Sequence, residues 1–258
     1  MERTFMLSRG ELQIFCKQTE PDFGEIRRVV LSVHGLGGST EDDIQTSIAE
    51  EMEFFSSAII RFDFPAHGNS PMTDAAFTLE NCRRSLLAAA EYARQQYPGV
   101  EDLCIFATGF GAYMVLICLE HLMELSGNIR LVVQTPSVLM HETLLSMKHL
   151  TAPTFRAMGE TTFRSQRPLT VQYSFYEELL ENVALTSYPI PMLILHGEYD
   201  DFIPWEHIQH LRRLNEDARL VIIPGASHRF LEEGAWDMVL DLTRDWFEFQ
   251  QVLVTDWE

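Results

Sequence analysis

The sequence has few basic residues and no long apolar run, and each lack excludes a class of protein. Its 19 Lys and Arg residues stand against 38 Asp and Glu, which gives a formal net charge of −19. That charge disfavours nucleic acid and anionic membrane surfaces as partners, because both would repel the chain. No apolar run reaches the roughly 20 residues that a membrane helix needs, and the N-terminal residues carry no apolar core of secretory length. We therefore expect no nucleic-acid or membrane partner, and a cytoplasmic location.

The motifs of disulfide, metal and nucleotide sites are also missing. The cysteines, Cys16, Cys82, Cys104 and Cys118, show no Cys-x-x-Cys spacing. We expect them to be reduced residues, three of them small core residues within strongly apolar stretches. His207 and His210 are three residues apart, but no His-Glu-x-x-His sequence accompanies them, and the glycines after the first strand lack the Gly-x-Gly-x-x-Gly spacing. The sequence thus predicts no metal and no cofactor.

What the sequence does contain is an alternation of buried strands and helices over a single domain, residues 1–258. Near-continuous apolar runs, rich in β-branched residues, predict strands buried on both faces of a mostly parallel sheet. These runs span residues 26–33, 58–64, 103–107, 129–134, 191–196 and 219–224. Helical patterns at 41–54, 79–97, 112–125 and 236–252 fall between or after them. We expect an α/β fold with helices on both faces of the sheet.

Two segments depart from the alternation. An antiparallel edge pair is expected around residues 12–17, with a turn at Glu20-Pro21-Asp22. Residues 135–188 form an apolar insertion after a sheet strand, with a hairpin expected at 161–173 and a short helix at 175–183. Such an insertion favours a lid over a pocket, and ordinary helices packed on the sheet are the alternative.

Glycine, histidine and aspartate gather in the loops that follow the strands. The loops are His34-Gly35-Leu36-Gly37-Gly38, then Asp63-Phe64-Pro65-Ala66-His67-Gly68-Asn69-Ser70, then Phe106-Ala107-Thr108-Gly109-Phe110-Gly111, then His196-Gly197-Glu198-Tyr199-Asp200, and last Pro224-Gly225-Ala226-Ser227-His228. In this order they resemble the α/β-hydrolase family over nearly the whole chain, from about residue 26 onward. The resemblance implies the α/β-hydrolase fold. It assigns His67 an architectural role.

The third loop resembles the family's nucleophile elbow, a sharp strand-to-helix turn of the form Gly-x-Ser-x-Gly. Small residues are needed two before and two after the nucleophile, because strand and helix approach closely there. Ala107 and Gly111 meet that demand, so the nucleophile position is Gly109. A register on Thr108 would place phenylalanine at both small positions. Glycine has no side chain and cannot form an acyl-enzyme.

The other loops complete what the resemblance implies for the site. Asp200 takes the position of the acid and His228 that of the histidine, in the family's chain order of nucleophile, acid and histidine. The backbone amides of Leu36 and Phe110 would form the oxyanion hole. An aspartate-held histidine is a general base near neutral pH.

The segment around 161–176 resembles the lid of cinnamoyl or feruloyl esterases, which implies a small acyl ester or aromatic acid as ligand, with Phe175 and Tyr176 as binding residues. A homodimer is compatible with these features. Three hypotheses for Gly109 remain open. The chain is an inactivated ester hydrolase, engineered or recently mutated, or a natural non-catalytic binding protein, or an enzyme in which the Asp200–His228 base acts without a covalent intermediate.

Overall fold

A mostly parallel sheet forms the centre of the molecule, which a computed structural model describes over residues 1–165 and 167–250. Its eight strands in the described part lie in the spatial order β1-β2-β4-β3-β5-β6-β9-β10. Their bounds are β1 Glu2–Arg9, β2 Leu12–Thr19, β3 Arg28–Val33, β4 Ser57–Phe62, β5 Asp102–Thr108, β6 Asn128–Gln134, β9 Met192–Gly197 and β10 Arg219–Ile223. Strands β4, β3, β5, β6, β9 and β10 run parallel, and β1 and β2 add an antiparallel edge beside β4. The predicted fold class is confirmed.

The antiparallel edge differs from the prediction in where the chain turns. Strands β1 and β2 pair through a tight turn at Gly10, whose φ is +63°. Pro21 instead lies in the connection from β2 to β3, two strands that are not neighbours in the sheet. Gly10 reaches this left-handed conformation without the steric penalty of a Cβ, so the hairpin closes about ten residues earlier than expected.

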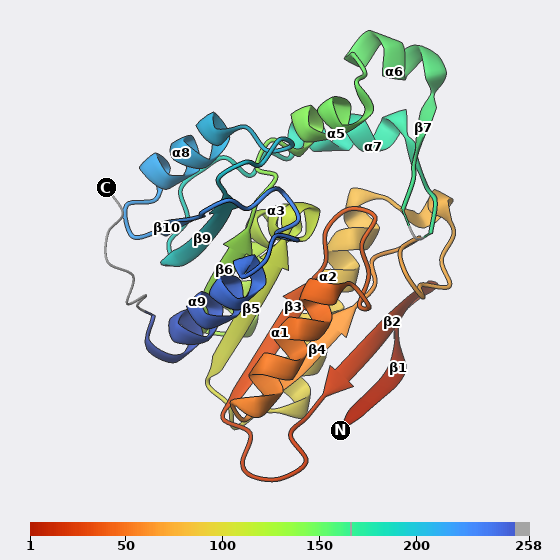
Figure 1. Cartoon of the computed structure of the whole chain (residues 1–258). Helices are drawn as coiled ribbons and strands as arrows, with labels where there is room; N and C mark the ends of the chain where they lie inside the picture. Colours follow the sequence, from red (N-terminus) through yellow and green to blue (C-terminus); the bar gives the residue numbers. More distant parts are fainter. Residues whose placement is uncertain (166, 251–258) are drawn as a thin grey trace.

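Helices cover both faces of the sheet, as Figure 1 shows for α1 and α9 in front and α2 and α3 behind. The residues Val30, Phe106 and Trp246 belong to the core under α1 and α9, and a larger core lies under α2, α3 and α4. The helices outside the insertion are α1 Asp43–Phe54, α2 Leu79–Gln96, α3 Gly109–Ile117, α4 Leu119–Leu125, α8 Trp205–Leu214 and α9 Ala235–Phe249, with a short 3-10 turn η1 at Asp74–Ala76.

Two of the predicted helices differ from the structure in their bounds. The helix predicted over 112–125 is two helices, α3 and α4, separated at Cys118, whose ψ is +4°. Helix α1 begins after Asp42, two residues later than predicted, and Ser39 accepts a hydrogen bond from the amide of Glu41 in the preceding turn. The end of the helix predicted over 236–252 lies outside the described residues.

The insertion at 135–188 contains two short strands and three helices: α5 Met140–Lys148, α6 Ala152–Met158, β7 Glu160–Phe163, β8 Leu169–Gln172 and α7 Tyr173–Glu181. Strands β7 and β8 pair in antiparallel fashion, and the predicted hairpin and helix are thus present; the tip of the predicted hairpin includes residue 166, outside the described residues. The aromatic rings of Phe155, Tyr173 and Tyr176 pack together at its centre. Figure 1 shows the insertion at one end of the sheet, beyond α3.

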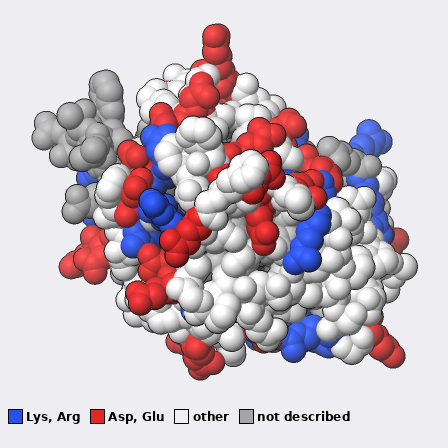
Figure 2. Space-filling model, turned by 90° about the horizontal axis from the view of Figure 1, so that it is seen from below, with Lys and Arg blue, Asp and Glu red and all other residues white. Residues whose placement is uncertain are grey.

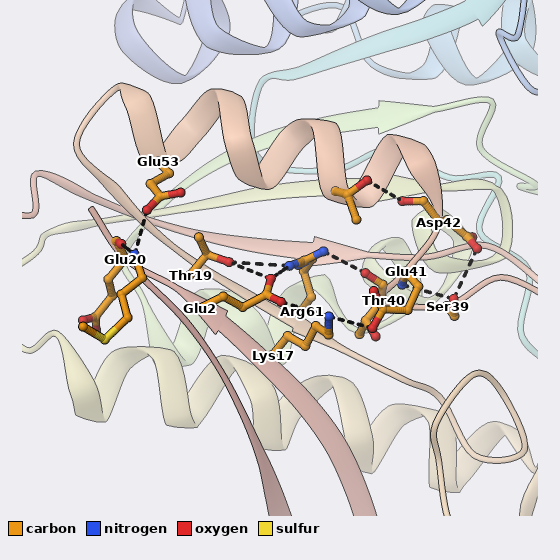
Figure 3. Close-up of polar contacts among 12 residues, drawn as sticks. Glu2, Lys17, Thr19, Glu20, Ser39, Thr40, Glu41, Asp42, Glu53 and Arg61 are labelled. Carbon is orange, nitrogen blue, oxygen red and sulfur yellow. Dashed lines mark hydrogen bonds and ion pairs between the residues drawn. The ribbon is translucent and has the colours of Figure 1, made fainter. Parts of the chain in front are cut away.

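A buried arginine ties the N-terminal edge to the loop before α1 (Figure 3). Arg61 of β4 is 2% exposed and donates to the carbonyl of Thr40 at 2.8 Å and to Thr19 at 3.5 Å. It also pairs with Glu2 of β1. Lys17 of β2 bridges Glu2 at 3.0 Å and Glu41 at 2.6 Å. Arg61 of β4 therefore links β1, β2 and the loop before α1.

The surface reflects the composition. Figure 2 shows acidic side chains spread over one face, with lysine and arginine between them. Within residues 1–165 and 167–250, no helix combines the length and the apolar character of a membrane crossing. All four cysteines are buried and unpaired, and burial raises the pKa of Cys118 to about 11, so these thiols are unreactive.

Candidate active site

The turn between β5 and α3 forms the centre of the site. Thr108 is extended (φ −118°, ψ +138°), and Gly109 then takes a φ of +49° as the first residue of α3. A Cβ on Gly111 would lie 2.4 Å from the carbonyl oxygen of His34, a distance that real Cβ atoms do not reach. The chain therefore needs glycine two residues after Gly109, as the predicted register requires.

The space that a side chain at position 109 would occupy is open. A Cβ placed there would have one neighbour within 4 Å outside the adjacent residues, the hydroxyl oxygen of Ser137 at 4.0 Å. The left-handed φ strains any other residue, but there is space for a side chain.

Asp200 and His228 lie together, on the loops after β9 and β10. Nδ1 of His228 is 2.9 Å from Oδ2 of Asp200 and 3.0 Å from Oδ1. The Asp200 carboxylate is fully buried, and it also accepts hydrogen bonds from the amides of Phe202 and Ile203, both at 2.9 Å. Because Asp200 accepts, Nδ1 carries the hydrogen, and Nε2 is the free nitrogen of the ring.

Burial by itself would raise the pKa of Asp200, but the hydrogen bond and charge of His228 and the two amides outweigh it, so that the pKa is lowered. Asp200 is thus held ionised. The neighbouring Asp201 is exposed to solvent. His196 lies 3.7 Å from the same carboxylate, and burial lowers its pKa, so it is a neutral neighbour.

The loop after β3 approaches the elbow from the other side. A Cβ on Gly35 would lie 3.5 Å from the carbonyl of Thr108, so the two loops are in contact there. His34 is buried, and its Nε2 accepts from the amide of Phe64 at 3.1 Å. Burial lowers its pKa to about 4 and that of His67 to about 3, so both rings are neutral structural parts.

These loops and the insertion enclose a cavity of about 620 Å³. Of the predicted site residues, Leu36, Gly109, Phe110 and His228 line it, and Asp200 lies behind His228. In the part of the chain that the structure describes, no hydrogen bond is recorded for the amide of Leu36 or of Phe110. Phe110 lies in the first turn of α3, where amides have no partner within the helix.

Phe175 and Tyr176 are not among the lining residues. Phe175 is 1% exposed and packs against Phe77 and Phe110, while Tyr176 packs against Phe155 in the insertion. Contact of these two rings with a ligand therefore stays a prediction.

The cavity wall includes residues that the sequence analysis did not single out for the site. Gln134 ends β6 beside Thr108 and is 3% exposed, and its Oε1 has no hydrogen-bond partner among the described residues. Ser137 follows it and donates its amide to the carbonyl of Gly109 at 3.3 Å. Gln134 is the last residue of β6 and Ser137 lies just past it, at the end of the sheet where ligands of open α/β sheets bind, and that rule points to them. Apolar side chains complete the wall: Met140, Met147, Phe163, Phe202, Leu231 and Trp236.

No group of three or more possible metal ligands occurs within residues 1–165 and 167–250. His207 pairs with Glu142 of α5 at 3.3 Å.

Residues 29–242 match the family model described as "Alpha/beta hydrolase family". The chain belongs to the α/β hydrolase family.

Solved structures share the fold over nearly the whole chain. Est1E from Butyrivibrio proteoclasticus, in a structure with ferulic acid bound, is 18% identical and has a TM-score of 0.80, with 95% of this chain and 98% of that chain covered. A putative hydrolase from Agrobacterium vitis S4 is 17% identical with a TM-score of 0.79, covering 95% of this chain and 97% of that one. At these identities the likeness shows the fold alone.

A closer match in sequence is short. The uncharacterized protein YfhR of Escherichia coli (strain K12) is 43% identical over 49 residues, which is 19% of this chain and 17% of that protein. This chain thus matches only about a sixth of that relative's length.

Proposed function

We propose that the chain is an esterase-like α/β hydrolase that retains the ester-binding and acid–base parts of its site but lacks the nucleophile. The single observation that carries the proposal is glycine at the elbow, at φ +49°, in a cavity that His228 also lines. The chain is then inactive or strongly impaired as a hydrolase. Loss of a triad nucleophile lowers kcat about a millionfold in a well-studied serine protease, which leaves only what binding and the oxyanion hole supply.

The proposed roles follow from the geometry. In an enzyme with serine at position 109, Nε2 of His228 would take the hydroxyl proton as the oxygen attacks the ester carbonyl, and would return it to the leaving alcohol. The ionised Asp200 holds the ring and stabilises the imidazolium. The amides of Leu36 and Phe110 would donate to the carbonyl oxygen as it gains negative charge.

The substrate class we propose is a small acyl ester, with an aromatic acid as the acyl group. The methionine and aromatic side chains of the wall support an apolar ligand, and the volume of about 620 Å³ is in the usual range for small-molecule sites. Est1E, whose fold the chain shares, was solved with ferulic acid bound. We propose the insertion at 135–188 as the lid, since Met140, Met147 and Phe163 contribute to the wall.

The test is restoration of the nucleophile in Gly109→Ser. We expect acyl-enzyme, detected by mass, and faster hydrolysis of nitrophenyl acetate and methyl ferulate. A gain of at least about a hundredfold is expected, a part of the roughly millionfold that a nucleophile contributes. The double variant Gly109→Ser/His228→Ala is the first control and must lose the gain. Gly127→Ser, at an exposed glycine with nothing within 4 Å of a Cβ, controls for added serine as such. A folded Gly109→Ser protein that stays inert would contradict the proposal.

A second candidate is hydrolysis by bound water, favoured by the open space at Gly109 beside the Ser137 hydroxyl. Water in that space would attack the ester carbonyl while Nε2 of His228 takes its proton. The same proton then goes to the leaving alcohol, and the acid is released without an acyl-enzyme. Slow turnover by the unchanged chain that disappears in His228→Ala, with no mass shift, would support this candidate.

A further inference from the structure

The volume that a nucleophile side chain would fill is open to the cavity in this chain. Apart from its chain neighbours and the backbone of the first turn of α3, a Cβ at Gly109 would have one neighbour within 4 Å among the described residues, the Ser137 hydroxyl at 4.0 Å. An atom of a ligand can therefore stand where the oxygen of a serine would stand. An ester hydrolase with an intact nucleophile has no such room.

Residues with hydrogen-bond donors line the same cavity as this space. The amide of Phe110 lies in the first turn of α3, where the partial positive charge of the helix end favours an anion. The amide of Leu36 has no recorded partner in the described residues and lines the same cavity. His228 presents Nε2, and Asp200 behind it stabilises the protonated ring.

An independent feature shows that the cavity calls for a polar occupant. The Oε1 of Gln134 is buried without a partner among the described residues, and Gln134 lines the cavity. A buried acceptor left unpaired is unfavourable. A carboxylate has no hydrogen to donate to it, so this position suits a hydroxyl elsewhere on the ligand, such as the phenol of ferulate.

The charges at the rim do not oppose an anion. Arg164 and Arg229 line the cavity together with Asp42 and Asp43, so the formal charges of these four residues cancel. Burial raises the pKa of Asp42, and the charge of Arg229 acts in the opposite direction. The attraction for an anion then comes from the local donors at the base of the cavity. This matters in a chain with a net charge of −19, whose surface in general repels anions.

We propose that this cavity binds free carboxylic acids as carboxylates, more tightly than the corresponding esters. One carboxylate oxygen accepts from the amides of Leu36 and Phe110. The other occupies the space at Gly109 and accepts from Nε2–H of His228, which takes up the proton of the acid, or one from solvent, on binding and lies between this carboxylate and Asp200. An ester has only one strong acceptor oxygen, so it satisfies one of these two positions. The inference rests on the proposed function for the role of the oxyanion amides. It adds that glycine at position 109 gives the site a higher affinity for the acid than for the ester.

Isothermal titration with sodium ferulate and methyl ferulate, and with sodium octanoate and methyl octanoate, tests the preference. We expect at least one acid to bind at least about tenfold more tightly than its methyl ester, the change in Kd that one charge-assisted hydrogen bond makes. His228→Ala, and His228→Asn as a second variant, should each remove that preference. Equal affinity for acid and ester, or no binding of either acid, overturns the proposal.

The sharpest measurement uses Gly109→Ser and Gly109→Ala, with thermal melting to show that both are folded. Each fills the space at Gly109, so each should weaken binding of the acid by about tenfold or more, while the Gly127→Ser control leaves it unchanged. Unchanged acid affinity in both filled variants overturns the proposal.

The same Gly109→Ser protein tests the proposed function separately. Restored ester turnover without any acid preference in the unchanged chain would refute the carboxylate site alone. Acid binding with an inert serine variant would refute the esterase-like function alone.

Discussion

The Cβ that Gly111 lacks would lie 2.4 Å from the carbonyl oxygen of His34 and 2.7 Å from that of Val33. This close approach of α3 to the end of β3 fixes the position of the elbow. It is the reason that the helix can begin directly at Gly109, in contact with the loop that carries Leu36.

Gly111→Ala should therefore destabilise the fold. Backbone carbonyls cannot move aside as a flexible side chain does, so we expect a loss of about 1–3 kcal/mol in the free energy of unfolding, typical of overpacking. Urea denaturation measures it. Gly127→Ala is the matched control, since a Cβ there meets nothing within 4 Å and its backbone conformation is ordinary. That control should be neutral or slightly stabilising. Equal stability of the two variants would contradict the close approach.

The pairing of Asp200 with His228 should make the free energy of unfolding depend on pH in a particular direction. The pKa of Asp200 is lowered in the folded chain, against an ordinary value of about 3.9. Its contribution to stability is therefore complete above about pH 4 and is lost as the pH falls through the lower folded-state value. Asp200→Asn should be destabilised relative to the unchanged chain at pH 7, by about 1–3 kcal/mol for a buried hydrogen-bonded group.

The difference between the two proteins should shrink as the pH falls below about 4, because Asp200 is then protonated first in the unfolded state and, at lower pH, in the folded state as well. Urea denaturation at pH 7, 5 and 3 follows it. Asp201→Asn, at the exposed neighbouring position, supplies the comparison and should show no such change. A difference that stays constant from pH 7 to 3 would speak against the ion pair as its source.

The parts of the site that the sequence predicted are those encoded in short loops at strand ends. Gly109 and His228 were each predicted from neighbours within a few residues, because a sharp turn between a strand and a helix needs small residues at fixed offsets. The sheet strands were also predicted from local sequence, because a strand buried on both faces has a continuous run of apolar residues. Whether these residues act as the resemblance implies stays a prediction until the variants above are measured.

The parts that were missed depend on contacts between distant segments. Gln134 and Ser137 join the site because β6 pairs with β5 and the following loop turns over Gly109. The break at Cys118 has no glycine or proline to mark it. The predicted hairpin turn at Pro21 is wrong, because the chain turns between β1 and β2 at Gly10, which has a positive φ. Tertiary packing decided each of these positions.

The buried Arg61 should contribute to stability beyond what a surface ion pair does. Arg61→Met removes the donors to Thr40 and Thr19 and leaves Glu2 with Lys17 as its remaining cation. We expect a loss of about 1.5–3 kcal/mol in the free energy of unfolding, the range for hydrogen bonds to a charged group. Arg9→Met, which breaks the partly exposed pair with Glu91, should change it by less than about 1 kcal/mol. Chemical denaturation compares the two, and similar losses would mean that burial of Arg61 adds nothing.

The β7–β8 hairpin is held against the body of the molecule by Arg167. Its guanidinium donates to the carbonyls of Ser70 and, at 2.7 Å, of Met72, and Asp74 accepts from the amide of Thr170 at 3.2 Å. Since Phe163 at the end of β7 lines the cavity, this anchor sets how firmly the proposed lid is closed. Arg167→Gln removes the two charged donors and should let the hairpin open locally, without unfolding the sheet.

Hydrogen exchange measured by mass spectrometry should show faster exchange in β7 and β8 of Arg167→Gln, by about tenfold if the anchor contributes about 1.4 kcal/mol. Amides of β5 and β6 should exchange at the unchanged rate, because their opening follows global stability. Arg156→Gln, an exposed arginine of α6, is the matched control and should leave the hairpin as it is. If Arg167→Gln instead accelerates exchange everywhere, Arg167 stabilises the whole fold, and the insertion is an integral layer of the domain with no independent lid motion.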